Sequence, residues 1–144
     1  MELKNVIKAK LDDIENIVAV DKEIIGNDSR RSYITNSVEE DRCIIAKDKN
    51  EIVGFLIYNT SFFDCSFISL IMVSPSKRRK GYATALIDYF VQIAPTKKVF
   101  SSTNQSNKDM QKVFIANDFV KSGVIENLDE GDPEVIYFKS KRFT

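Results

Sequence analysis

The chain has 144 residues, 43% of them hydrophobic, and 21 basic residues balance 21 acidic ones. This length suits one buried core, so we expect residues 1–144 to form a single domain. Zero net charge gives no global field that would attract nucleic acid or an anionic membrane, and neither is an expected partner. The absence of histidine excludes Ser-His-Asp and Cys-His catalytic systems and histidine metal sites.

The sequence also predicts where in the cell the protein is located. No apolar run approaches the roughly 18 residues that a membrane-spanning helix needs. The first residues mix acidic and basic side chains, which is not the pattern of a cleavable signal. Cys43 and Cys65 show no metal-ligand spacing, and two such thiols indicate a reducing compartment. We therefore expect a cytoplasmic protein.

Strands and helices alternate along the chain without a repeat. In chain order, the pattern predicts a strand at 3–9, helices at 11–25 and 30–40, a hairpin at 43–46 and 51–59, a strand at 66–73, a helix at 81–93, a strand at 98–101, a helix at 107–116, and strands at 119–125 and 135–139. Gly26 ends the first helix, Asp28 or Ser29 is predicted to cap the second, and Pro95 ends the third.

The segment between the strand at 66–73 and the helix at 81–93 is the most informative. It is basic and leads directly into the helix N-terminus, where unpaired N–H groups and a partial positive charge stabilise an anion. Gly81 allows the backbone to come close to that anion. Arg78 and Arg79 add planar forks that match phosphate oxygens. The segment has the architecture of a phosphate-binding loop.

At these residues the chain resembles the Gcn5-related N-acetyltransferases, whose acyl-CoA loop has the pattern (Gln/Arg)-x-x-Gly-x-(Gly/Ala). The matching stretch is Arg78-Arg79-Lys80-Gly81-Tyr82-Ala83. Further landmarks follow in the family's order: a Val-x-Pro lead-in at Val73, and an Asn-x-x-Met-x-x-Val-Phe segment from Asn107 to Phe114. The resemblance implies an α/β (α+β) fold with a mixed, mostly antiparallel sheet of about six to seven strands and helices on both faces.

The resemblance also implies a cofactor site. The backbone of Ile71, Met72 and Val73 would pair with the pantetheine arm like an added strand, and an N–H of Ile71 or Met72 would polarise the thioester carbonyl. No metal is implied. The cofactor-binding residues by resemblance are Ile71, Met72, Val73, Arg78, Arg79, Lys80, Gly81, Tyr82, Ala83, Thr84, Asn107 and Phe114. Asn107 has an alternative role as a helix cap, and Tyr82 as a packing residue.

The implied reaction is direct transfer of an acetyl group from acetyl-CoA, as co-substrate, to a primary amine of a small molecule or peptide. An alkylammonium with a pKa near ~10.4 is only about 0.1% deprotonated at neutral pH, so a base would help. The family's usual base and acid positions align with Phe67 and Phe114, so both groups are missing. Asp64 and Tyr137 are candidate substitutes for base and acid, or else a turn residue and a packed strand residue.

An acidic loop at 126–134 joins the last two predicted strands. In the family this connection often borders the acceptor pocket, so Asp129 and Glu130 are candidate contacts to a cationic amine. The alternative is a solvated turn built by Gly131 and Pro133.

Two other functions stay open. A catalytically weak or inactive sensor or regulatory module that binds acyl-CoA is favoured by the loss of both acid–base groups. An ATP-binding domain is less consistent, because the loop lacks the GxxxxGK(S/T) spacing. Family members often dimerise, so a homodimer is possible.

Overall fold

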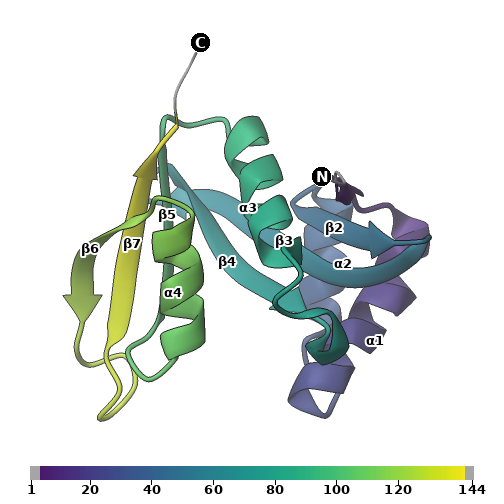
Figure 1. Cartoon of the computed structure of the whole chain (residues 1–144), viewed down its shortest axis with the longest axis horizontal. Helices are drawn as coiled ribbons and strands as arrows, with labels where there is room; N and C mark the ends of the chain where they lie inside the picture. Colours follow the sequence, from purple (N-terminus) through teal and green to yellow (C-terminus); the bar gives the residue numbers. More distant parts are fainter. Residues whose placement is uncertain (1–3, 142–144) are drawn as a thin grey trace. The chain divides into compact units, whose positions relative to one another are not determined.

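A computed structural model describes residues 4–141, and over this range seven strands form one sheet in the order β1-β2-β3-β4-β5-β7-β6 (Figure 1). Strands β4 and β5 run parallel, whereas the pairs β1–β2, β2–β3, β5–β7 and β6–β7 are antiparallel. The elements are β1 (Asn5–Lys8), a 3-10 turn (Leu11–Asp13), α1 (Ile14–Ile25), α2 (Arg31–Glu39), β2 (Cys43–Asp48), β3 (Glu51–Phe62), β4 (Cys65–Val73), a 3-10 turn (Pro75–Lys77), α3 (Tyr82–Ile93), β5 (Lys98–Asn104), α4 (Lys108–Ala116), β6 (Val120–Ile125) and β7 (Glu134–Ser140). The predicted mixed, mostly antiparallel sheet is confirmed.

The contacts within the chain group it into two compact units. The first unit runs to Tyr58 and includes Leu70–Phe90, and the second contains Asn59–Ser69 and the chain from Val91 on. Strand β4 passes from the second unit to the first after Ser69. That residues 1–144 form one domain stays a prediction. None of the helices in the described range is long and apolar enough to cross a membrane.

In the first unit, helices cover both faces of the β2–β3 hairpin. Side chains alternate between the faces of a strand, and those on one face form a core with α1 and α2. Its buried members are Ala9, Ile17, Val18, Val20, Ile34, Val38, Cys43, Ile45, Ile52, Phe55 and Ile57. The other face meets α3: the rings of Tyr58 and Phe90 lie 5.2 Å apart, and a Cβ on Gly54 would lie 3.4 Å from Leu86.

The end of α1 is as predicted, but the predicted cap of α2 is wrong. Gly26 has φ +87°, and its N–H donates to the carbonyl of Lys22, so it closes α1 as a left-handed residue. Arg30 holds the N-cap position of α2 and makes no side-chain capping bond. Ser29 instead donates its N–H to the Asn27 side chain at 3.0 Å, because an asparagine can bond to the backbone two residues on and form a turn.

Several strands are longer than predicted. The β2–β3 turn is confined to Lys49 and Asn50, which both have positive φ, as the tight turns that suit paired strands require. Strand β5 continues to Asn104, opposite Glu134 of β7. The polar end of β5 stays in the sheet because its side chains find partners there: the Ser102 hydroxyl donates to the Glu134 carboxylate at 2.7 Å.

In the second unit, α4 packs on one face of the strands through aromatic rings. Phe114 of α4 is 1% exposed. Its ring stacks on Tyr137 of β7, with centroids 5.1 Å apart, and lies 5.4 Å from the ring of Phe119. Ser101 of β5 is the register partner of Tyr137 and is also buried. The landmark phenylalanine of the helix is therefore a core residue of this unit.

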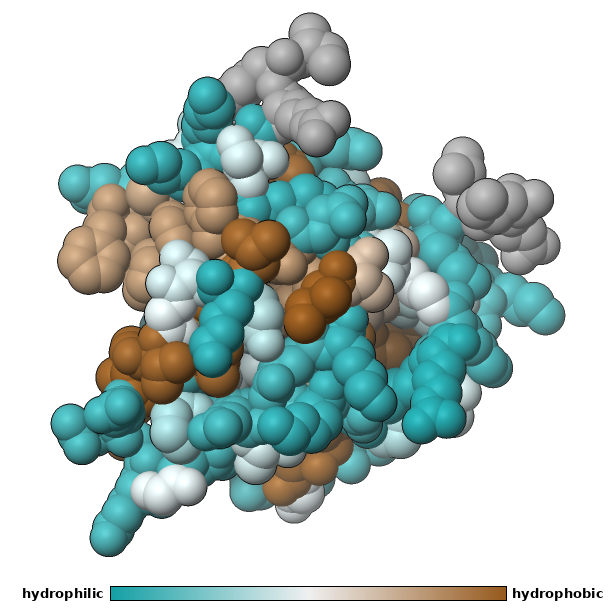
Figure 2. All heavy atoms as spheres, turned by 60° about the vertical axis from the view of Figure 1, so that its left-hand side comes forward, coloured by the Kyte–Doolittle hydropathy of each residue, from teal (hydrophilic) through white to brown (hydrophobic). Residues whose placement is uncertain are grey.

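The opposite face of the same strands carries a row of aromatic side chains. Phe67, Phe100 and Phe138 are register partners on β4, β5 and β7. Phe62 stacks on Phe67 at 4.7 Å and lies 5.2 Å from Phe100. Phe63, at the tip of the β3–β4 hairpin, is 86% exposed. Figure 2, which brings the β6 and β7 side forward, shows tan and brown side chains gathered among teal ones.

Candidate active site

The predicted phosphate-binding loop lies in the first unit, between β4 and α3. Ser74 follows β4 and is held by its N–H, which donates to Val53 at 2.8 Å, before the 3-10 turn at Pro75–Lys77. Arg79 and Gly81 then have φ of +62° and +89°. Helix α3 starts at Tyr82 with no acidic residue in its first turn. The loop therefore presents helix N–H groups without a neighbouring carboxylate of its own, which favours an anion.

The basic side chains of the loop differ in how they are held. The Arg78 Nε donates to the carbonyl of Val73 at 3.2 Å, which ties the guanidinium back to the end of β4. The Lys77 ammonium donates to the Asp48 carboxylate at 2.8 Å. This bond is the main reason that the pKa of Asp48 is lowered and that of Lys77 is raised. Arg79 and Lys80 are exposed, so they are available to a ligand.

The edge of β4 next to β5 is only partly paired. The β4–β5 ladder contains Ser66, Phe67 and Ile68, although β4 continues to Val73 and β5 to Asn104. Among the described strands, Ile71, Met72 and Val73 thus have no ladder partner on this edge. A free edge is what an extended ligand needs if it is to bind like an added strand.

Tyr82, Ala83 and Thr84 form the first turn of α3, directly after the loop. Tyr82 is 6% exposed, which supports its alternative role as a packing residue. The ammonium of Lys4 lies 4.5 Å from the centroid of its ring. The sequence does not predict this contact, because no local pattern connects a residue before the first strand with a loop that follows the fourth.

Asn107 and Phe114 belong to the second unit. Asn107 is the N-cap of α4, and its side-chain oxygen accepts a hydrogen bond from the N–H of Met110 at 3.1 Å. The alternative role of Asn107 as a helix cap is therefore confirmed. The cap uses the side-chain oxygen, so the NH₂ group of the same side chain can still donate hydrogen bonds. Phe114 is buried against Tyr137. Their contact with the cofactor stays a prediction.

The two candidate acid–base residues have very different surroundings. Asp64 lies at the tip of the β3–β4 hairpin with φ +62° and is exposed, which fits a turn residue. Tyr137 is 3% exposed, and burial raises the pKa of its phenol above the usual value of 10.0. Phe67 and Phe114, at the family's usual base and acid positions, are both engaged in aromatic packing.

The acidic loop is folded back on the end of β5. Asn104 donates to the Asp129 carboxylate at 2.8 Å. Ser106 donates to the Asp132 carboxylate through both its N–H, at 3.0 Å, and its hydroxyl, at 2.6 Å. Glu130 is exposed, and no hydrogen bond joins it to another described residue. Of the two predicted acceptor contacts, Asp129 has a local partner and Glu130 faces solvent.

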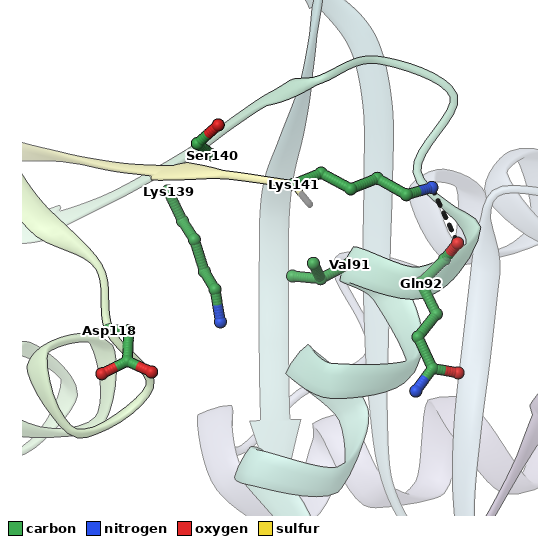
Figure 3. A pocket seen from close by; sticks show the side chains of 6 residues that line it. All are labelled: Val91, Gln92, Asp118, Lys139, Ser140 and Lys141. Carbon is green, nitrogen blue, oxygen red and sulfur yellow. Dashed lines mark hydrogen bonds between the residues drawn. The ribbon is translucent and has the colours of Figure 1, made fainter. Parts of the chain in front are cut away.

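A hollow of about 730 Å³ in the second unit contains none of the predicted site residues (Figure 3). Its lysines bond to helix ends. Lys141 donates to the carbonyls of Gln92, in the last turn of α3, and of Ala94, just after it, and Lys139 donates to the carbonyl of Asn117 after α4. Cations at these positions satisfy the last carbonyls of the helices. These two lysines are therefore engaged at helix ends.

Comparisons with known proteins identify the family of this chain. The sequence model of the acetyltransferase (GNAT) family matches residues 11–119. The crystal structure of a GNAT-family acetyltransferase from Bacillus cereus superimposes on this chain with a TM-score of 0.95, and the two sequences are 58% identical. The alignment covers 99% of this chain and 100% of the other. A comparison with curated proteins gives no significant match.

Two more distant structures share the fold. The ribosomal-protein-S18-alanine N-acetyltransferase from Escherichia coli is 11% identical with a TM-score of 0.83, covering 98% of this chain and 96% of the other. A protein assigned as a streptothricin acetyltransferase from Bacillus anthracis, in complex with acetyl coenzyme A, is 20% identical with a TM-score of 0.64, covering 68% of this chain and 61% of the other. With the family match and the 58% identical structure, the chain belongs to the GNAT family of acetyl-CoA-dependent N-acetyltransferases.

Proposed function

We propose that this protein transfers the acetyl group of acetyl-CoA directly to a primary amine of a small molecule or peptide. The proposal depends on the backbone around the start of α3. Arg79 and Gly81, just before the helix, have positive φ, and the first helical turn lacks acidic residues. A diphosphate is stabilised there by N–H groups and by exposed cations. The distant relative that was crystallised with acetyl coenzyme A supports the same cofactor.

In this proposal the pantetheine arm extends along the free edge of β4 at Ile71, Met72 and Val73. A backbone N–H on this edge polarises the thioester carbonyl. The unprotonated amine attacks the carbonyl carbon and the C–S bond breaks, so that the acetyl group leaves sulfur for nitrogen. The amine gives up a proton, and the CoA thiolate takes one.

Tyr137 is the better of the two candidates for the proton that the thiolate takes. Its ring is buried, yet no hydrogen bond joins its hydroxyl to any other described residue. Within the described range no buried side-chain oxygen or nitrogen lacks a partner, so the hydroxyl must be accessible. Tyr137 also lies in the row Ile68–Ser101–Tyr137, where the β4–β5 ladder ends. A raised pKa keeps the phenol protonated, as an acid requires.

The role of Tyr137 is tested by Tyr137→Phe, which keeps the ring that stacks on Phe114 and removes only the hydroxyl. We expect kcat to fall about 100-fold, the lower end for loss of one acid–base group, with KM for acetyl-CoA unchanged. Tyr89→Phe on α3 is the matched control and should keep the wild-type kcat. A kcat of Tyr137→Phe within about threefold of the wild type would exclude the hydroxyl from proton transfer.

The acceptor side of the proposal rests on the acidic loop. Glu130 has no partner among the described residues and would attract a cationic amine, whereas Asp129 holds Asn104. Glu130→Gln should raise KM for the acceptor without changing thermal stability. An unchanged acceptor KM would leave the loop as a turn only.

The proposed function is tested first by calorimetry with acetyl-CoA, beside ATP as a control, followed by CoA release with a panel of amines. Micromolar binding of acetyl-CoA alone, with turnover of an amine, is the expected result. Tight binding without turnover across the panel would favour the second candidate, an acyl-CoA sensor, to which aromatic Phe67 and Phe114 at the usual acid–base positions point. No binding of acetyl-CoA would overturn both.

A further inference from the structure

The start of α3 meets a cation from a distant part of the sequence. Lys4 precedes β1, and β1 pairs with β2 so that Asn5 lies opposite Lys47. The Lys4 ammonium lies 4.5 Å from the centroid of the Tyr82 ring. A Cβ built on Gly81 would lie 3.8 Å from the Lys4 Cε. The side chain of Lys4 therefore extends along Gly81, the last residue of the loop, and Tyr82, the first residue of α3.

The charge of Lys4 is not neutralised by a partner. Lys4 helps to lower the pKa of Asp48, but the largest cause of that shift is the hydrogen bond from Lys77. Within residues 4–141 no hydrogen bond or ion pair ties the Lys4 ammonium to a carboxylate. An ammonium that rests on an aromatic face keeps its N–H donors for another group.

We propose that Lys4 is a phosphate contact for coenzyme A, its ammonium donating to a phosphate oxygen held at the N-terminus of α3. The inference rests on the proposed binding of the cofactor phosphates to residues 78–84. Coenzyme A offers the diphosphate and the 3′-phosphate, and both present charged oxygens that bind an ammonium strongly. Contact with Tyr82 orders the Lys4 side chain before the ligand arrives, which lowers the entropic cost of binding.

Lys4 complements the other cations of the site. Arg78 is tied to the carbonyl of Val73, and Lys77 is engaged by Asp48, so these two are oriented by the protein itself. Lys4 is far from these residues in the sequence, and the β1–β2 ladder, which starts at the next residue, Asn5, holds it in place. Binding of the phosphate would therefore connect the start of the chain to the loop before α3.

The test compares Lys4→Met, which keeps most of the apolar stem and removes the charge, with Lys4→Arg, which keeps the charge. Lys22→Met is the matched control, because Lys22 is an exposed lysine of α1 in the same unit. The Kd for acetyl-CoA and for 3′-dephospho-acetyl-CoA is measured by calorimetry at several salt concentrations. We expect Lys4→Met to raise the Kd for acetyl-CoA about tenfold and to weaken its salt dependence, because one charge-assisted contact is lost.

Lys4→Arg should bind within about threefold of the wild type, and Lys22→Met should bind like the wild type. Weaker binding of both cofactors by Lys4→Met identifies the diphosphate as the partner, and weaker binding of acetyl-CoA alone identifies the 3′-phosphate. Equal Kd values for Lys4→Met and Lys22→Met would overturn the inference, as would a Lys4→Arg variant as weak as Lys4→Met. A wild-type protein that does not bind acetyl-CoA would overturn the proposed function itself, which is a separate outcome.

Thermal unfolding of each variant confirms that it is folded, and Lys4→Gln replaces Lys4→Met if that variant is not.

Discussion

Gly81 is the residue on which the predicted phosphate-binding loop depends most directly. Its φ of +89° lies in a region that side chains rarely adopt. The nearest side-chain atom to a Cβ there would be the Lys4 Cε at 3.8 Å, an ordinary contact. The requirement for glycine is therefore conformational rather than steric, and it fits the motif position at which the family also has glycine.

Gly81→Ala should lower the free energy of unfolding by about 1–2 kcal/mol, the cost of a left-handed conformation for a residue with a Cβ, and should weaken acetyl-CoA binding because the N–H groups would turn. The control is Gly123→Ala on β6, where a Cβ meets nothing within 4 Å and φ is not left-handed. Urea unfolding and calorimetry measure the two effects. If both alanine variants lost the same stability, the strain at Gly81 would not be the cause.

At the scale of elements, an ion pair with a buried carboxylate joins α1 to the N-cap residue of α2. The Arg30 guanidinium donates to both oxygens of Asp21, at 2.5 and 3.0 Å, and the Asp21 side chain is 2% exposed. A second pair joins Arg31 to Glu15 at 2.6 Å, but there both side chains are well exposed. The two pairs therefore allow a comparison between a buried and an exposed contact of the same helices.

Asp21→Asn should destabilise the protein by about 3 kcal/mol, because removing one charge of a buried pair leaves the other without its partner. Glu15→Gln should leave stability unchanged within error, because water screens an exposed pair. Denaturant unfolding of both variants provides the measurement. A loss of stability in Glu15→Gln equal to that in Asp21→Asn would contradict the importance of burial.

At the scale of the whole molecule, the stability of the fold should depend on alkaline pH through Cys43. This residue is 1% exposed, and burial raises the pKa of its thiol from 9.0 to about 12. Between these two values the folded chain keeps a proton that the unfolded chain has lost. The contribution of Cys43 to stability is therefore complete below about pH 9. As pH rises above this value, the free energy of unfolding declines by up to ~1.4 kcal/mol per pH unit from this group alone.

We expect the wild type to lose stability more steeply than Cys43→Ala between pH 9 and 11. Other groups titrate in this range in both proteins, so the difference between the two slopes isolates the thiol. The measurement is urea unfolding under reducing conditions, with Cys65→Ala, a half-buried cysteine, as the control that should behave like the wild type. Parallel declines in the wild type and Cys43→Ala would show that the thiol does not contribute.

Local patterns were sufficient wherever a residue acts on its own neighbours in the sequence. Gly26 ends α1, Asn107 caps α4, and the basic segment before Gly81 leads into α3, all as the sequence predicts. These features follow from φ preferences and from side-chain bonds that span a few residues. The sequence by itself therefore determined the family resemblance, the position of the basic loop before α3 and most of the element order.

Only the tertiary structure decided features that depend on residues far apart in the chain. Polar Ser102, Thr103 and Asn104 belong to β5 because β7 pairs with them. Lys4 meets Tyr82 because the β1–β2 ladder brings it there. The physical reason is that strand pairing and burial are set by non-local partners, which no short pattern contains. Both the extra length of the strands and the contact of Lys4 with Tyr82 therefore appear only when the chain is folded.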